Sequence, residues 1–82
     1  MGKTENILAA ILRGTSDSNI RFADLRYALE ELGFEVRIKG DHFLYTRQGV
    51  AEIVNIQPLG SKAKAYQVKQ FRSIILKYKL AR

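Results

Sequence analysis

The chain has 82 residues, with 14 basic and eight acidic side chains, one histidine and no cysteine; this length suits one small domain spanning residues 1–82, and the lack of cysteine excludes a disulfide framework and thiolate chemistry. The apolar run at residues 7–12 is too short to cross a bilayer and has no cleavage site after it, so we expect a soluble cytoplasmic protein without membrane contact. The formal charge of +6 is uneven, because residues 36–82 hold ten basic and only two acidic side chains, which is typical of a protein that binds a polyanion.

A first helix is predicted from about Thr4 to Arg13, because apolar residues recur at helical spacing and Gly14 follows as a stop signal. Its apolar stripe consists of Ile7, Leu8, Ile11 and Leu12. A polar connector comes next. We therefore expect residues 1–19 to be an addition to a core formed by residues 20–82.

A second helix is predicted over about Phe22 to Leu32, with Gly33 as its C-terminal cap. The residues that share its apolar face are Phe22, Leu25, Ala28, Leu29 and Leu32.

Two strands follow, at residues 34–39 and 42–47, and the Gly40-Asp41 dipeptide between them predicts a tight two-residue turn. That loop length places Lys39 opposite His42 on one face of the hairpin. The apolar pairs predicted for the other face are Ile38 with Phe43 and Val36 with Tyr45. Since the apolar pairs fall together, we expect their face to join the core.

A second hairpin is predicted through Gln48-Gly49, which leads into a third strand at residues 51–57. A two-residue loop here places Asn55 opposite His42 on the central strand, with Cβ atoms roughly 5 Å apart. Two apolar residues share this polar face without a burial partner, and they are Leu44 and Ile53. They indicate a contact surface for a protein partner.

Pro58 ends the third strand, and a basic loop leads into a last helix from about Ala65 or Tyr66 to Tyr78. Its predicted buried stripe is Val68, Phe71, Ile74, Ile75 and Tyr78. The basic residues expected to point away are Lys69, Arg72 and Lys77. The whole order predicts an α+β fold, an α-β-β-β-α two-layer sandwich with an extra N-terminal helix and one open sheet face.

His42 is the principal candidate for chemistry near neutral pH, because it is the only histidine. Cations that would contact the phosphates of a polyanion such as a nucleic acid are Arg37, Lys39, Lys62, Lys64, Lys69 and Arg72. The tyrosines expected to pack rather than to stack on bases are Tyr27, Tyr66 and Tyr78. No metal site or cofactor is expected, since the carboxylates are scattered and no phosphate-binding glycine fingerprint occurs.

Four segments together resemble the HicA-type toxins, which are small mRNA interferases of bacterial type II toxin-antitoxin systems. The segments are Leu32-Gly33-Phe34, the run from Arg37 that ends in Gly40-Asp41-His42, the run from Ile53 to Pro58, and Tyr66-Gln67-Val68-Lys69-Gln70. The similarity extends over residues 20–78, and the combined order of the segments is far more specific than any one of them.

This resemblance implies a fold like that of a double-stranded RNA-binding domain, with a phosphate-gripping loop at residues 60–64. It also implies a metal-independent endoribonuclease acting on mRNA, with His42 as the catalytic residue and a HicB-type antitoxin as the protein partner. Asp41 stands where the family usually has a serine. A carboxylate there favours protonated His42, whereas Lys39 across the ladder favours the neutral form, so both general acid and general base roles stay open.

Two other functions are compatible with the same residues. A non-catalytic RNA-binding module would use the basic loop and the open sheet face without cleaving RNA. A DNA-binding accessory protein is less favoured, because no recognition-helix turn is evident.

Overall fold

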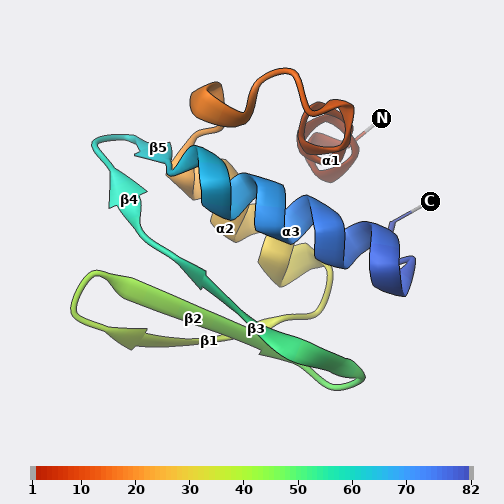
Figure 1. Cartoon of the computed structure of the whole chain (residues 1–82), viewed down its shortest axis with the longest axis vertical. Helices are drawn as coiled ribbons and strands as arrows, with labels where there is room; N and C mark the ends of the chain where they lie inside the picture. The colour runs from red at the N-terminus through yellow and green to blue at the C-terminus, as the bar shows by residue number, and fades with distance from the viewer. Residues whose placement is uncertain (1, 82) are drawn as a thin grey trace.

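The computed structural model describes residues 2–81, which form three α-helices, a short 3₁₀ helix and two antiparallel sheets (Figure 1). The elements in chain order are α1 (Lys3–Arg13), η1 (Asp17–Asn19), α2 (Phe22–Glu31), β1 (Glu35–Lys39), β2 (His42–Arg47), β3 (Val50–Ile56), β4 (Pro58–Leu59), β5 (Lys62–Ala63) and α3 (Ala65–Tyr78). The predicted α+β class is confirmed. No helix in this range is long and apolar enough to cross a membrane.

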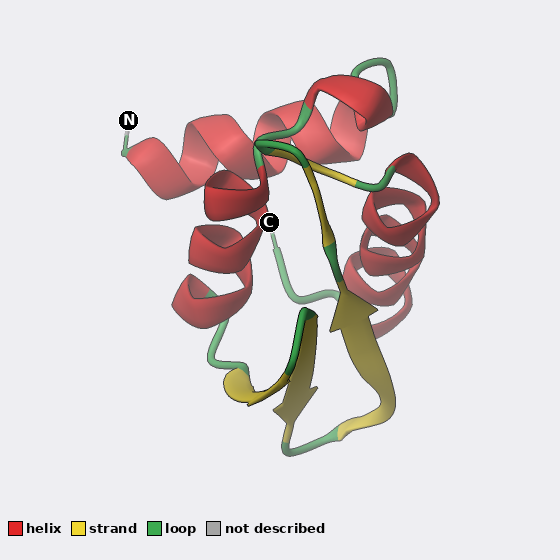
Figure 2. Cartoon of the chain, turned by 90° about the vertical axis from the view of Figure 1, so that its left-hand side faces the viewer, coloured by secondary structure: helices red, strands yellow, loops and turns green. Residues whose placement is uncertain are grey.

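The three-stranded sheet has the order β1-β2-β3, and α2 and α3 both lie over one of its faces (Figure 1). Helix α1 lies on the side of these helices that is away from the sheet, as the turned view shows (Figure 2). The opposite face of the sheet carries no helix among the described residues. That face is open, as the sequence predicts.

Glycine ends both of the first two helices. Gly14 follows α1 with φ 73°, and Gly33 follows α2 with φ 90°. After α2 the N–H of Gly33 donates to the carbonyl of Glu30 and the N–H of Phe34 donates to that of Leu29, both at 3.1 Å. This double capping motif needs a left-handed residue that glycine adopts without strain. It turns the chain directly into β1.

The first hairpin has the predicted register. Lys39 pairs with His42 and Ile38 with Phe43, and Gly40 takes φ 60° in the turn between them. The two-residue loop therefore places His42 on the open face, opposite a lysine.

The second hairpin keeps its predicted register only at the turn, where Arg47 pairs with Val50. Beyond a bulge, Tyr45 pairs with Val54 and Leu44 with Asn55. The prediction that Asn55 lies directly opposite His42 is therefore wrong by two residues. Because the shift is even, every side chain stays on its predicted face.

Helix α3 supplies the physical reason for the bulge. The N–H of Ala51 donates to the hydroxyl of Tyr78 at 3.2 Å. The carboxylate of Glu52 accepts from Tyr78 at 2.7 Å and from Lys77 at 2.9 Å. Hydrogen bonds from these two side chains lower the pKa of Glu52 to about 2. Residues 51 and 52 are thus bound by α3 at the point where the register shifts.

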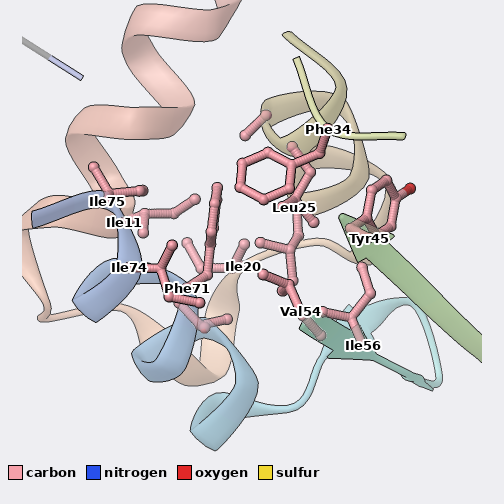
Figure 3. Packing of buried hydrophobic residues seen from close by; sticks show 14 of the residues in the cluster. Ile11, Ile20, Leu25, Phe34, Tyr45, Val54, Ile56, Phe71, Ile74 and Ile75 are labelled. Atoms are coloured by element: carbon pink, nitrogen blue, oxygen red, sulfur yellow. The ribbon is translucent and has the colours of Figure 1, made fainter. Parts of the chain in front are cut away.

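The hydrophobic core lies between the sheet and the helices, and its largest fully buried side chain is Tyr45 (Figure 3). Other fully buried residues are Ile11, Leu25, Leu29, Val54, Ile56, Val68, Phe71 and Ile75. Ile11 belongs to α1, so the additional helix shares this core. The prediction that Val36 and Ile38 join the core is wrong, since both are exposed, because β1 is an edge strand that the two helices do not cover.

The predicted basic loop is instead a second, two-stranded sheet formed by β4 and β5. Gly60 and Ser61 make its turn. The N–H of Ala63 donates to the carbonyl of Ile20 at 2.9 Å, and the N–H of Phe22 donates to that of Ser61 at 3.0 Å. This small hairpin therefore joins the start of α2 to the start of α3.

Candidate functional site

His42 begins β2 on the open face of the sheet, and its side chain is 48% exposed. Two amide side chains hold its ring. Nδ1 lies 3.4 Å from Oδ1 of Asn55, and Nε2 lies 3.3 Å from Nε2 of Gln57. Asn55 is the diagonal neighbour on β3 rather than the direct partner, and Gln57 follows the end of that strand. The imidazole is held at both nitrogens while its surface stays accessible.

The contacts at both nitrogens suit the neutral imidazole with its proton on Nδ1. In that tautomer Nδ1 donates to Asn55 and Nε2 accepts from the amide of Gln57. The charged form also has a partner, because Oδ1 of Asp41 lies 3.7 Å from Nε2. Nε2 therefore has an amide and a carboxylate as neighbours.

Gln57 connects the histidine to the start of α3. Its Oε1 accepts from Nζ of Lys64 at 3.2 Å, and its backbone N–H donates to Oε1 of Gln67 at 2.8 Å. Lys64 is the N-cap residue of α3, and Gln67 is buried in the first turn. A cation and a helix N-terminus, both of which attract anions, thus lie beside the group that holds His42.

Sequence reasoning places Asn55 beside His42 but misses Gln57 and Gln67. The signal for Gln57 is present, because residues 53, 55 and 57 alternate onto one face of β3. No pattern marks Gln67, since a glutamine inside an apolar stripe gives no sign of which backbone group it will bind.

The predicted cations lie in two places, on β1 beside His42 and on the segment from β5 into α3. Lys39 lies opposite His42 in the ladder, and both it and Arg37 are exposed on β1. Lys62 donates to Oδ1 of Asn19 at 2.8 Å, and Lys69 is exposed on α3. Within residues 2–81 none of the lysines 39, 62, 64 and 69 forms a salt bridge, so their charges are available to a polyanion.

Arg72 differs from the prediction that it points away from the core. Its guanidinium binds both carboxylate oxygens of Asp17, at 2.8 and 3.1 Å, and also donates to the carbonyl of Ile11 at 3.0 Å. The Arg72 side chain is 16% exposed. Its charge is balanced inside the protein, so the expectation that Arg72 contacts RNA loses its physical basis.

A shallow groove of about 290 Å³ lies on the open face beyond His42. Its lining residues are Glu35, Val36, Arg37, Leu44, Thr46 and Ile53. Ile53 is exposed and Leu44 is half-buried, so the predicted apolar pair stands on the face of the histidine.

One tyrosine differs from its predicted packing role. Tyr27 and Tyr78 are half-buried and pack against the core. Tyr66, in contrast, is 62% exposed at the start of α3. Its hydroxyl accepts from Nε2 of Gln67 at 3.4 Å, so the exposed ring stands next to the group that fixes Gln57.

Comparison of the chain with protein-family models, with curated proteins and with solved structures finds no match. Within residues 2–81 no three or more His, Cys, Asp or Glu side chains come together as a group that could hold a metal ion.

Proposed function

We propose that the chain is a HicA-type toxin, an endoribonuclease that cleaves mRNA without a metal ion and uses His42 as its proton-transfer group. The observation that carries the proposal is the half-exposed His42 ring held between Asn55 and Gln57 on an open face. Fixing both ring nitrogens orients the imidazole before substrate binds, which is what efficient proton transfer requires.

In the proposed reaction the ribose 2′-oxygen attacks the adjacent phosphorus while the bond from phosphorus to the 5′-oxygen breaks. Neutral His42 accepts the 2′-hydroxyl proton at Nε2, where the RNA hydroxyl replaces the amide of Gln57. The products are a 2′,3′-cyclic phosphate and a 5′-hydroxyl, the latter protonated by imidazolium or water. Lys39 and Lys64 stabilise the charge that develops on the phosphoryl oxygens.

The RNA surface in this proposal consists of β1, the start of β5 and the start of α3. Its contributing cations are Arg37, Lys39, Lys62, Lys64 and Lys69, all exposed or half-buried. We also assign the unit of α2, the three-stranded sheet and α3 to the class of double-stranded-RNA-binding-domain-like folds. Its order of elements and the basic segment entering the last helix support that assignment.

The proposed protein partner is a HicB-type antitoxin that covers the groove beside His42. Leu44 and Ile53 give this groove apolar surface, and Arg37 at its edge suits an acidic partner. A protein seated there would exclude RNA from His42 by the same contact, so inhibition would be steric.

The test is RNA cleavage by purified wild type, His42→Ala and His42→Gln. We expect both variants to lose 10² to 10⁴-fold in rate, roughly the contribution of general acid-base catalysis. Their melting temperatures and RNA affinities should match the parent, because a half-exposed strand residue carries little packing energy. Wild-type cleavage should persist in EDTA, and full cleavage by His42→Gln would refute the mechanism.

The second candidate is a non-catalytic RNA-binding module. It is favoured by the lack of a second histidine in the sequence, because one imidazole cannot accept and donate a proton in the same instant. Under this alternative, wild type binds RNA and leaves it intact in the assay above.

A further inference from the structure

We propose that Tyr66 is a stacking platform for an unpaired base, so that the enzyme's preferred substrate is single-stranded RNA. This inference deepens the proposed function, on which it rests. Tyr66 is 62% exposed, which is close to the 64% of Leu59 and Leu76 and well above the exposure of the tyrosines that pack on the core. An aromatic ring usually stabilises a protein through the apolar area that it buries. The exposed ring of Tyr66, at the start of α3, contributes little in that way.

Hydrogen bonds tie this ring to the candidate catalytic group through two glutamines. The Tyr66 hydroxyl accepts from Gln67, and Gln67 accepts from the backbone of Gln57. The Gln57 amide in turn contacts Nε2 of His42. The ring is thus anchored at its hydroxyl end, within the same cluster of side chains as the imidazole, while most of the residue stays exposed.

The electrostatic surroundings favour a nucleic acid over a protein as the group that covers Tyr66. Lys64 precedes it on the chain and contacts Gln57, and Lys69 lies one helical turn further on. No acidic residue occurs after Glu52 in the sequence. A tyrosine among uncompensated lysines combines the two parts of a single-strand binding site, a cationic track for phosphates and a ring for bases.

A strand that places its scissile phosphate at His42 and a neighbouring phosphate at Lys64 would bring a nearby base to Tyr66. That base must leave its own helical stack to meet the ring, which a paired base resists. Stacking at Tyr66 therefore selects unpaired RNA.

The experiment introduces tryptophan as a stacking reporter into His42→Ala, which binds RNA without cutting it. The chain has no tryptophan, so Tyr66→Trp gives a single tryptophan, whose fluorescence can be excited selectively over that of the remaining tyrosines. Leu76→Trp is the matched control, because Leu76 is 64% exposed on the same helix and roughly 15 Å further along its axis. We expect a single-stranded RNA oligonucleotide to quench the fluorescence of Tyr66→Trp strongly and that of the control weakly.

Two further RNA ligands test whether the quenching requires an unpaired base. A blunt duplex of the same sequence and a strand with abasic residues should both quench much less than the intact single strand. In the same background Tyr66→Ala should weaken single-strand binding about 5- to 10-fold, whereas Tyr66→Phe should stay within twofold, because the ring and not the hydroxyl does the stacking.

Unchanged fluorescence of Tyr66→Trp while the RNA binds would overturn the inference and leave the proposed nuclease intact. That outcome would point to a protein as the cover for Tyr66. Failure of any RNA to bind would overturn both proposals. Quenching by RNA that the wild type does not cleave would support the stacking site and refute catalysis.

Discussion

The contact between Asp17 and Arg72 offers a quantitative test of how the N-terminal segment is held. It joins η1 to α3, and the same guanidinium closes the end of α1 through the carbonyl of Ile11. The two side chains are 18% and 16% exposed. The chosen change is Asp17→Asn, which keeps the shape of the side chain and removes its charge.

The loss of unfolding free energy expected for Asp17→Asn lies between two limits. An exposed ion pair contributes about 0 to 1 kcal/mol, whereas breaking a fully buried pair costs about 3 to 5 kcal/mol. The Asp17–Arg72 pair is mostly buried and bidentate, but asparagine can still accept one of the two hydrogen bonds. We therefore expect Asp17→Asn to lower the free energy of unfolding by about 2 kcal/mol, which corresponds to a fall of roughly 8 to 16 °C in Tm for a domain of this size.

The same contact fixes the pH dependence of the loss. The hydrogen bond from Arg72 lowers the pKa of Asp17 from its ordinary value of 3.8. A carboxyl with a lowered folded-state pKa stabilises the protein fully above its unfolded pKa, and the contribution disappears as pH falls through the folded value. The difference in Tm between parent and Asp17→Asn should thus be constant from about pH 5 to 7 and shrink below about pH 4.

Thermal melts of the parent, Asp17→Asn and the control Glu31→Gln test this reasoning. Glu31 is exposed at the end of α2, so its variant loses the same charge at a cost within about 0.5 kcal/mol. Arg72→Met should also melt lower while binding RNA like the parent. A melt of Asp17→Asn within about 2 °C of the parent, or a loss of RNA affinity in Arg72→Met without a change in Tm, would refute the structural role.

Three further predictions concern the surface around His42. Replacing both Lys62 and Lys64 with alanine should weaken binding to unrelated RNA sequences and flatten the slope of log K against log salt by about 0.7 for each lost phosphate contact. A salt titration of RNA binding measures this slope, and an unchanged slope would exclude these lysines from the interface. Gln57→Leu should lower kcat roughly 10- to 100-fold at similar KM, because the imidazole loses its orientation, and ¹⁵N NMR should show His42 as a mixture of tautomers; a retained single tautomer would contradict that role. Ile53→Asp should weaken antitoxin binding by about 1 to 3 kcal/mol in calorimetry while sparing RNA affinity, and a variant that melts like the parent and binds antitoxin equally would exclude Ile53 from the interface.

The sequence could predict those parts of the fold that depend on neighbouring residues. The Gly40-Asp41 turn determined the first hairpin register, and Gly33 with its following Phe34 determined how α2 ends. In each case the deciding atoms lie within a few residues of one another. Local turn chemistry therefore sufficed to place His42 on the open face.

Long-range contacts account for the parts that the sequence could not predict. Arg72 has the helical position of a solvent residue, and two distant groups draw it inward: the carboxylate of Asp17, 55 residues away, and the carbonyl of Ile11. Val36 and Ile38 have the alternation of a buried strand, yet the helices end their coverage at β2. Tyr66 resembles other packing tyrosines in its sequence context, and its exposure depends on where α3 sits.

The register of the second hairpin depends on both local and long-range contacts, because the packing of α3 changes a pairing that the turn alone would have set differently. The C-terminal end of α3 binds residues 51 and 52 through Tyr78 and Lys77, and its N-terminal end binds Gln57 through Gln67. Between these two attachments β3 advances two residues past its expected pairing. Gln57 then arrives beside His42, where the uninterrupted ladder would have put Asn55. The amide pair at the imidazole is consequently a product of the packing of α3 on the sheet.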